Sequence, residues 1–152
     1  MGGRAVSDPV SPDKIARDLR TEFHFERGCV FCQIVAETAP AHVVRVWDDA
    51  IAIVPLRPVT EGHTLVIPRT HVVSFYSSPE VSAATMRRAA ELGHGLESWE
   101  GPFGLDANII TSIGPNATQT VKHLHVHVVP RRKDDGLALP WSPDPNKETA
   151  NA

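Results

Sequence analysis

Three histidines alternate with branched apolar residues in the run His123-Leu124-His125-Val126-His127-Val128-Val129-Pro130. A repeat of two is typical of a β-strand with one dry face, because successive side chains point to opposite faces. The three imidazoles are therefore expected on one face, about 6.6–6.8 Å apart, with the apolar side chains between them in a core. A lone histidine is commonly structural, but three on one face each displace a residue that could be buried cheaply. The run indicates a functional site.

The composition bounds the kind of protein. The chain has 152 residues, 41% hydrophobic and 22% charged, which predicts one globular domain with a real core. A formal net charge of −3 argues against a nucleic-acid polymer as partner, since such binders are normally basic. No apolar run approaches the eighteen or so residues of a membrane span. Residues 1–7 lack the apolar core of a signal peptide, so we expect a cytoplasmic protein with no membrane partner.

The two cysteines, Cys29 and Cys32, form a Cys-x-x-Cys pair. In a reducing compartment this spacing indicates metal binding or redox chemistry rather than a structural disulfide. Apolar residues recur at helical spacing over 29–36, so a short helix is expected to present both cysteines on one side. Redox chemistry is the less favoured alternative, because such motifs usually adjoin a βαβ unit.

The remaining pattern predicts four more strands, over 43–47, 50–54, 63–67 and 107–111, and a long helix from Ser78 to about Glu97. Five strands with short connections predict an α+β fold with an antiparallel sheet. We expect three parts: an N-terminal arm over 1–22, the folded domain over 23–136, and an irregular tail over 137–152. For the arm, a helix over 11–19 and a mobile segment are equal alternatives.

Three motifs together resemble the histidine triad (HIT) superfamily of nucleotide hydrolases and transferases. Residues 119–131 (QTVKHLHVHVVPR) resemble its signature, and 62–71 (GHTLVIPRTH) resemble its second motif. Residues 29–32 (CVFC) are similar to the N-terminal motif of its zinc-carrying bacterial members. The resemblance implies a HIT-like fold, in which helices pack on one face of a five-stranded antiparallel sheet. It also implies that two subunits join their sheets into a ten-stranded homodimer.

The resemblance further implies a hydrolase that acts at the α-phosphate of a nucleotide conjugate. His125 would be the nucleophile, forming a covalent nucleotidyl-histidine through one ring nitrogen before water hydrolyses it. Its other nitrogen would be held by a main-chain carbonyl of the preceding loop, near Ala117 or Thr118. His127 would stabilise charge or assist the leaving group, and His63 would line the same pocket in a supporting role.

Other positions of the resemblance would meet the substrate. Gln119 and Thr120 match positions that bind phosphate oxygens. Ser112 and Thr118 stand where many relatives carry Asn and Gly, so Ser112 reaches less far and Thr118 adds a Cβ near the phosphate. Pro55 falls where many members place an Asp or Asn that binds the ribose hydroxyls. The nucleoside is therefore not specified by this sequence.

The resemblance also implies a structural zinc ion. Cys29, Cys32, His71 and His123 match the zinc ligands of members with the Cys-x-x-Cys motif. Two thiolates and two imidazoles make a closed tetrahedral set, which is typical of structural zinc. Strand geometry counts against one zinc on all three histidines of the run, since the first and third would lie roughly 13 Å apart.

Two functions remain open at this level. One is a HIT hydrolase acting on nucleoside phosphoramidates or dinucleoside polyphosphates. The other is a zinc-stabilised nucleotide-binding protein with little turnover. Arg131 and Arg132 either attract an anionic substrate or form a solvated basic turn.

Overall fold

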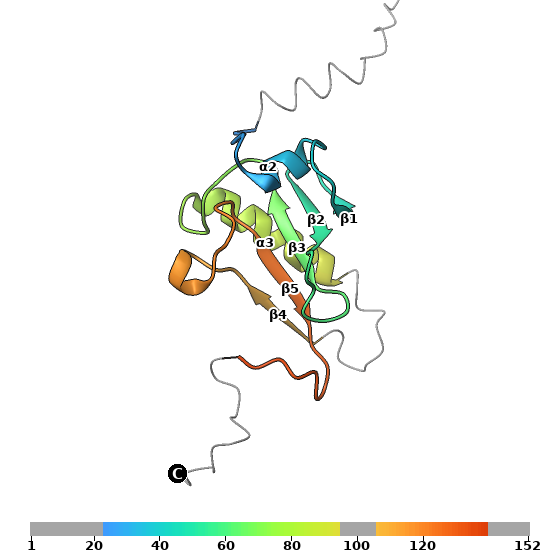
Figure 1. Cartoon of the computed structure of the whole chain (residues 1–152). Coiled ribbons are helices and arrows are strands. Elements are labelled where there is room, and N and C mark those ends of the chain that lie inside the picture. The colour runs from blue at the N-terminus through green and yellow to red at the C-terminus, as the bar shows by residue number, and fades with distance from the viewer. Residues whose placement is uncertain (1–22, 95–105, 140–152) are drawn as a thin grey trace, which may run out of the picture.

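The computed structural model describes residues 23–94 and 106–139 (Figure 1). Its elements are α2 (Val30–Val35), β1 (His42–Val46), β2 (Ala50–Val54), β3 (Thr64–Pro68), α3 (Pro79–His94), β4 (Ala107–Ile110), the 3-10 helix η1 (Pro115–Ala117) and β5 (Val126–Pro130). The strands form one sheet in the order β1-β2-β3-β5-β4, and every neighbouring pair is antiparallel. This confirms the predicted α+β fold with a five-stranded antiparallel sheet. The helix expected over 11–19 and residues 95–97 of the long helix lie outside the described residues.

The two faces of the sheet carry different cores. Helix α3 packs against β3 and β5 on one face, where small side chains of β2, Ala50 and Ala52, let it approach closely. On the other face, Ile51 and Ile53 of β2 pack with residues of β3 and α2. The alternation along β2 is the period of two that a strand requires. Burying each of these isoleucines stabilises the fold by about 1.5–3 kcal/mol.

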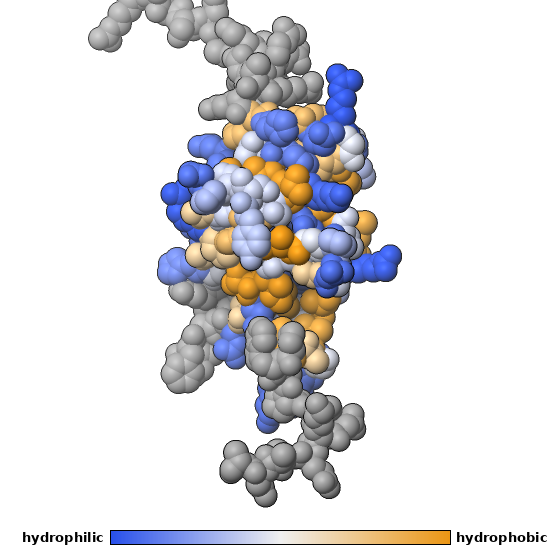
Figure 2. Space-filling model, turned by 90° about the vertical axis from the view of Figure 1, so that its left-hand side faces the viewer, coloured by the Kyte–Doolittle hydropathy of each residue, from blue (hydrophilic) through white to orange (hydrophobic). Residues whose placement is uncertain are grey.

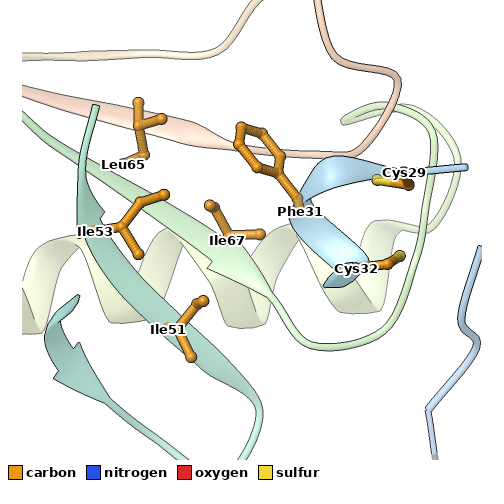
Figure 3. Close-up of a cluster of buried hydrophobic side chains, with 7 residues drawn as sticks. All are labelled: Cys29, Phe31, Cys32, Ile51, Ile53, Leu65 and Ile67. Carbon is orange, nitrogen blue, oxygen red and sulfur yellow. The ribbon is translucent and has the colours of Figure 1, made fainter. Parts of the chain in front are cut away.

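The short helix α2 covers the face opposite α3, so the expectation that the helices share one face of the sheet is wrong: both faces of β2 and β3 carry apolar side chains, and each face needs a cover. Phe31 lies over the same face as Ile53, Leu65 and Ile67 (Figure 3). Cys29 is the N-cap residue of α2 and Cys32 lies in its first turn. The predicted short helix with both cysteines on one side is therefore confirmed, and its packing on β3 fixes where the cysteines lie.

The strand that was predicted to begin at His123 begins later in the structure. β5 starts at Val126, so His123 and His125 precede it. Pro68, which ends β3, explains the difference. The next N–H, that of Arg69, donates to Asp49 on the β2 side. The nitrogen of Pro68 therefore faces the β5 side, where proline has no N–H to donate.

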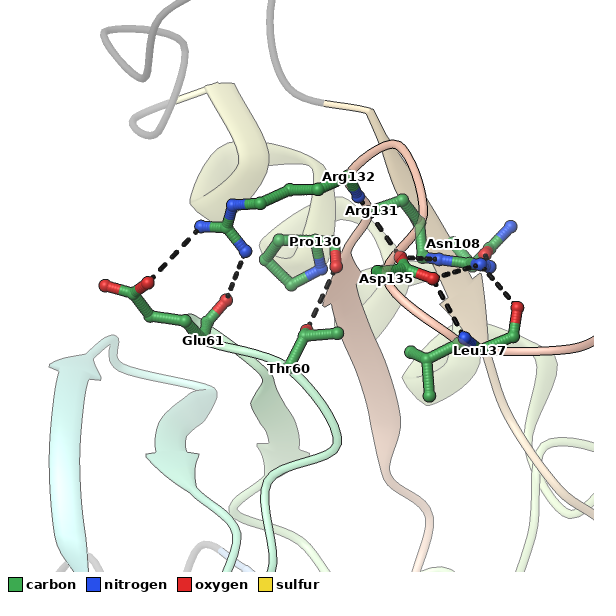
Figure 4. A network of polar contacts seen from close by, with 8 residues as sticks. All are labelled: Thr60, Glu61, Asn108, Pro130, Arg131, Arg132, Asp135 and Leu137. Atoms are coloured by element: carbon green, nitrogen blue, oxygen red, sulfur yellow. Dashed lines mark hydrogen bonds and ion pairs between the residues drawn. The ribbon is translucent and has the colours of Figure 1, made fainter.

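Arg131 and Arg132, which follow β5, form hydrogen bonds and ion pairs with neighbouring segments (Figure 4). The Arg131 guanidinium donates to both carboxylate oxygens of Asp135, at 2.6 and 3.0 Å, and to the Asn108 side chain on β4 at 2.6 Å. The same ion pair holds the pKa of the Asp135 carboxyl well below its usual range. Arg132 pairs with Glu61 at 3.7 Å. Of the two alternatives for this basic turn, attraction of substrate is the less supported for Arg131, because its guanidinium already binds residues 135–137 and β4.

Candidate active site and metal centre

Two cysteines and two histidines from three segments meet beside α2. Cys29 and Cys32 come from α2, His71 follows β3, and His123 precedes β5. Their ligand atoms all lie within 4.8 Å of one another. The predicted grouping is confirmed: these residues, called the metal cluster below, are placed to hold a metal ion and to tie α2 to the two central strands.

The distances within the metal cluster fit a tetrahedral site. The Sγ atoms of Cys29 and Cys32 lie 3.4 and 3.5 Å from Nδ1 of His123, and Sγ of Cys32 lies 3.3 Å from Nδ1 of His71. Zinc bonds of about 2.3 Å to sulfur and 2.0–2.1 Å to nitrogen place a sulfur about 3.5 Å from a nitrogen across a tetrahedron. The spacing thus matches the two-thiolate, two-imidazole set expected for zinc.

The surroundings of the metal cluster also favour a cation. Nε2 of His123 donates to the carbonyl of Pro68 at 2.9 Å, which leaves the lone pair of Nδ1 facing the sulfurs. Burial lowers the pKa of His123 to about 4, so its ring is neutral as ligation requires. Burial raises the pKa of the Cys32 thiol to about 11. A bound divalent cation is what would make the thiolate favourable in this buried place.

His125 presents one ring nitrogen as a nucleophile. Its Nδ1 donates to the carbonyl of His123 at 2.7 Å, so the proton lies on Nδ1 and Nε2 keeps its lone pair. Burial lowers the pKa of His125, which favours the neutral ring. The predicted acceptor near Ala117 or Thr118 is wrong. The chain bends at 121–123 instead of entering the sheet, which leaves the carbonyl two residues back within reach of the ring.

His127 and His63 form a hydrogen-bonded pair. The Val59 N–H donates to Nδ1 of His63 at 3.1 Å, so the His63 proton lies on Nε2. That Nε2 is 2.9 Å from Nδ1 of His127, and His63 is thus the donor in this contact. The remaining proton of His127 must lie on its own Nε2. The ring centroids of His125 and His127 are 5.1 Å apart, so the ring that offers a lone pair and the ring that offers an N–H are neighbours.

Burial keeps the pair neutral. It lowers the pKa of His127 to about 4, and it also lowers the pKa of His63. Neutral rings preserve the sequence of donors and acceptors that begins at the Val59 N–H. His63, which was predicted to line the same pocket, is in direct contact with His127, and its position on the chain just before β3 brings it there.

Gln119 holds the loop between β4 and β5 together. Its Oε1 accepts from the Gly114 N–H at 2.9 Å, and its Nε2 donates to the carbonyls of Val73 and Val121 at 2.6 and 3.1 Å. These contacts occupy the amide that was predicted to meet phosphate. In this structure Gln119 therefore shapes the loop, and Ser112, at the start of the loop, lies on its half-buried side.

Thr118 closes η1 in the left-handed region, with φ 64°. A β-branched residue rarely adopts this conformation. The loop needs it because the Gln119 N–H turns back to the Gly114 carbonyl at 3.1 Å. Thr118, which stands where many relatives carry glycine, is therefore strained. It lies next to the predicted phosphate-binding residues.

Two residues near the histidines were not found by the sequence reasoning. The Thr111 hydroxyl donates to the His125 carbonyl at 2.9 Å. The Phe31 ring meets the rings of His123 and His125 edge-on, with centroids 5.9 and 5.2 Å apart. A polar residue ending a strand and an aromatic residue between two cysteines were the available signals, but neither indicates a partner without the fold.

A cavity of about 510 Å³ opens beside the metal cluster. Its lining consists of Glu26, Gly28, Cys29, Val30, His71, Val73, Thr120, Val121 and Lys122. Seen from the left-hand side of the view in Figure 1, the surface of the molecule shows hydrophobic patches bordered by hydrophilic side chains (Figure 2). Thr120, a predicted substrate contact, thus shares a cavity with Cys29 and His71 of the metal cluster.

Comparison with known proteins agrees with this geometry. The family model described as HIT domain matches residues 36–134. The chain belongs to the HIT family. An uncharacterized HIT-like protein of Mycobacterium tuberculosis is 37% identical over 117 residues, which are 73% of this chain and 76% of that protein.

Two solved HIT structures resemble the chain. A zinc-bound histidine triad family protein from Mycobacterium smegmatis is 40% identical, with a TM-score of 0.61 over 76% of this chain and 84% of that one. A HIT family hydrolase from Clostridium thermocellum is 25% identical, with a TM-score of 0.60 over 78% and 97%. Within 23–94 and 106–139, the HIT domain has no helix long and apolar enough to cross a bilayer.

Proposed function

We propose that this HIT protein is a hydrolase that transfers a nucleotidyl group to water, cleaving a nucleotide conjugate at its α-phosphate. The observation that carries the proposal is the pair of fixed tautomers. His125 offers the lone pair of Nε2, and the neighbouring His127 offers the N–H of its own Nε2. A nucleophile beside a hydrogen-bond donor is what attack on a phosphorus atom requires.

In the first step, Nε2 of His125 attacks the α-phosphorus. The new P–N bond forms as the bond from phosphorus to the leaving group breaks, and the leaving group keeps the electron pair and takes a proton from solvent. The ring becomes cationic, and its Nδ1–H remains on the His123 carbonyl. Water then attacks phosphorus and loses a proton to solvent, the P–N bond breaks, and a nucleoside monophosphate leaves with the lone pair restored to His125.

His127 would act as a donor rather than as a source of protons. Its Nδ1 accepts the hydrogen bond from His63, so the proton of His127 stays on Nε2, the nitrogen that is not in this contact. A donor held in this way stabilises charge on the phosphoryl oxygens as the transition state forms. His63 is a positioning residue in this proposal, since it acts through His127.

The other predicted substrate contacts fall into two groups. We propose that Thr120 and Ser112 meet phosphate oxygens, while Gln119 and Thr118 shape the loop that carries them. Pro55 offers no side-chain acceptor for ribose hydroxyls, so we expect weak selection of the nucleoside. Phosphoramidates and dinucleoside polyphosphates remain the two substrate classes to compare.

We further propose that Cys29, Cys32, His71 and His123 hold a structural zinc ion. The fit of the metal cluster supports this, as does the zinc in the related protein from Mycobacterium smegmatis. When bound, the zinc would cross-link α2 to the ends of β3 and β5 and would take no part in the chemical steps. The two free cysteines suit a reducing compartment, and we propose a cytoplasmic enzyme.

A homodimer with a ten-stranded sheet is part of the proposal. The β1 edge carries a bulge between Val43 and Arg45, which is a common protection against edge pairing. The β4 edge has a regular register with β5 and exposes Ile109. We therefore propose pairing through β4. Ile109→Asp should give a monomer by light scattering, and a dimer that survives this change contradicts the proposed edge.

The catalytic proposal is tested by screening phosphoramidates, dinucleotides and sugar nucleotides with purified protein. For the best substrate, His125→Ala should lower kcat by about 10⁴-fold or more and keep nucleoside monophosphate binding. Protein denatured during wild-type turnover should carry the nucleotide on His125. Wild-type turnover no faster than that of His125→Ala, with nucleotide binding intact, would instead favour the zinc-stabilised binding protein.

A further inference from the structure

His123 belongs to two sites at once. Its ring lies in the metal cluster, with Nδ1 3.4 and 3.5 Å from the two sulfurs. Its main-chain carbonyl accepts the proton-bearing Nδ1 of His125 at 2.7 Å. The side chain is fully buried and its Nε2 is fixed on the Pro68 carbonyl. One residue therefore connects the metal ligands to the contact that sets the tautomer of the nucleophile.

Two further contacts run along the same route. The Phe31 ring, which lies between Cys29 and Cys32 in the chain, packs edge-on against both His123 and His125. The N–H of Leu124, between the two histidines, donates at 2.7 Å to the carbonyl of Val72. Val72 directly follows the ligand His71. The ring of the nucleophile and the residue before it are thus held by segments that carry the metal ligands.

The metal cluster is open on one side. Cys32 and His123 have no exposed surface, whereas Cys29 and His71 line the cavity of about 510 Å³. Small ions and chelators can reach the cluster through this cavity. Among the residues that the structure describes, those that line the cavity do not include His63, His125 or His127. A molecule in this cavity therefore need not cover His125 or His127, although it would lie beside Thr120.

We propose that His123 transmits the occupancy of the metal cluster to His125, so that metal loading and release through the cavity raise and lower hydrolysis. This inference rests on the proposed hydrolase function. With metal bound, the His123 ring is anchored and its carbonyl holds the His125 proton on Nδ1. Without metal, two neutral thiols and two imidazoles share the space, and the His123 ring keeps only its contact with the Pro68 carbonyl, so its own carbonyl is held less firmly. His123 is a positioning residue, because it acts only through His125.

The first test compares wild-type protein before and after a zinc chelator, and again after zinc is restored. Loss of zinc should lower kcat by about 10–100-fold, the usual range for outer-shell partners, with KM within about threefold. Nitrogen-15 NMR of the His125 ring should show the proton on Nδ1 with zinc and a mixture of tautomers without it. Circular dichroism monitors folding throughout. Zinc-free protein that keeps both kcat and the tautomer overturns the inference, and so does zinc-free protein that is unfolded.

The second test separates His123 from general loss of a ligand. His71→Asn and His123→Asn each remove one imidazole and leave three protein ligands, and both are measured with zinc loaded. His71→Asn should lower kcat by about threefold, while His123→Asn should lower it by about 10–100-fold and change the His125 tautomer. Equal effects overturn the inference. Leu92→Ala, on the buried face of α3, is the stability control and should leave the tautomer unchanged.

These measurements distinguish failure of the inference from failure of the proposed function. If no substrate is hydrolysed, the NMR readout still reports whether zinc sets the His125 tautomer. If the protein is inactive but its His125 tautomer changes with zinc, the connection through His123 is supported and the hydrolase function is rejected. Hydrolysis that is indifferent to zinc would retain the hydrolase and reject the connection.

Discussion

The metal cluster and the catalytic histidines use the same residue type in opposite orientations. In the metal cluster, His123 gives Nε2 to a carbonyl and turns Nδ1 toward the sulfurs. In the catalytic site, His125 gives Nδ1 to a carbonyl and leaves Nε2 available. The histidines are two positions apart in one run. The difference teaches that the carbonyl each ring reaches, rather than the alternating pattern, decides which nitrogen is available for metal or phosphorus.

The largest expected effect comes from breaking the metal side of this comparison. Cys32→Ser should remove the zinc, about one ion per chain in the wild type. The free energy of unfolding should fall on the order of 5 kcal/mol, because metal binding contributes directly to folding. Metal analysis and denaturant unfolding measure the two quantities. Ile51→Val, in the same core, should keep the zinc and cost about 1 kcal/mol. A Cys32→Ser protein as stable as this control contradicts the prediction.

The next effect breaks the catalytic side. His127→Asn removes the held N–H beside the nucleophile and should lower kcat by about 10²–10³-fold, the usual cost of losing an oxyanion donor. His63→Leu removes only the group that fixes the tautomer of His127, so a loss of about tenfold is expected. Steady-state kinetics at constant zinc measure both. A larger loss for His63→Leu than for His127→Asn would show that the roles are assigned in the wrong order.

The pH dependence of stability sharpens the comparison further. Burial lowers the pKa of His127 to about 4 in the folded protein, against about 6.5 in an unfolded chain. Between these values the unfolded state binds more protons, so this group's stabilising contribution falls as pH decreases from about 6.5 to 4. His127→Asn should flatten that part of the profile in urea unfolding measured at several pH values. An unchanged profile would mean that His127 is not held neutral.

The smallest effect concerns the strained loop before the histidines. Thr118→Gly should raise the free energy of unfolding by about 1 kcal/mol, because glycine adopts the positive φ without steric cost. The control, Asn116→Gly in η1, should destabilise by about 0.5–1 kcal/mol, because a helical position gains nothing from glycine. Thermal unfolding of both variants decides. Destabilisation by Thr118→Gly would contradict the strain.

Much of the fold follows from local pattern. The Ile and Ala alternation of β2 predicts its bounds correctly, because both faces of that strand are buried by different layers. Ser78 and Pro79 correctly predict the start of α3, where the Val81 N–H donates to the Ser78 hydroxyl. These signals lie within a few residues of the structure they specify, so no knowledge of distant contacts is needed.

The details of the site depend on contacts between distant segments. The period of two predicts a strand from His123. The pairing of β5 with β3 instead begins at Val126, opposite Val66, because Pro68 at the end of β3 has no N–H to extend it. The acceptor of the His125 proton was predicted wrongly for the same reason. Gln119 matches a position tied to phosphate by resemblance, whereas its amide binds the carbonyl of Val73, which no local pattern identifies. The grouping of the four metal ligands was predictable because the resemblance carries the fold with it.

Pro68 has a consequence for the whole active region. By interrupting the ladder of hydrogen bonds, it lets residues 123–125 leave the sheet, and the His123 ring lies against the two cysteines of the metal cluster. A residue with an N–H at this position could extend the pairing to Leu124 and draw that histidine into line with the other two. A missing hydrogen on one nitrogen thus divides a uniform row of imidazoles into a ligand and a nucleophile.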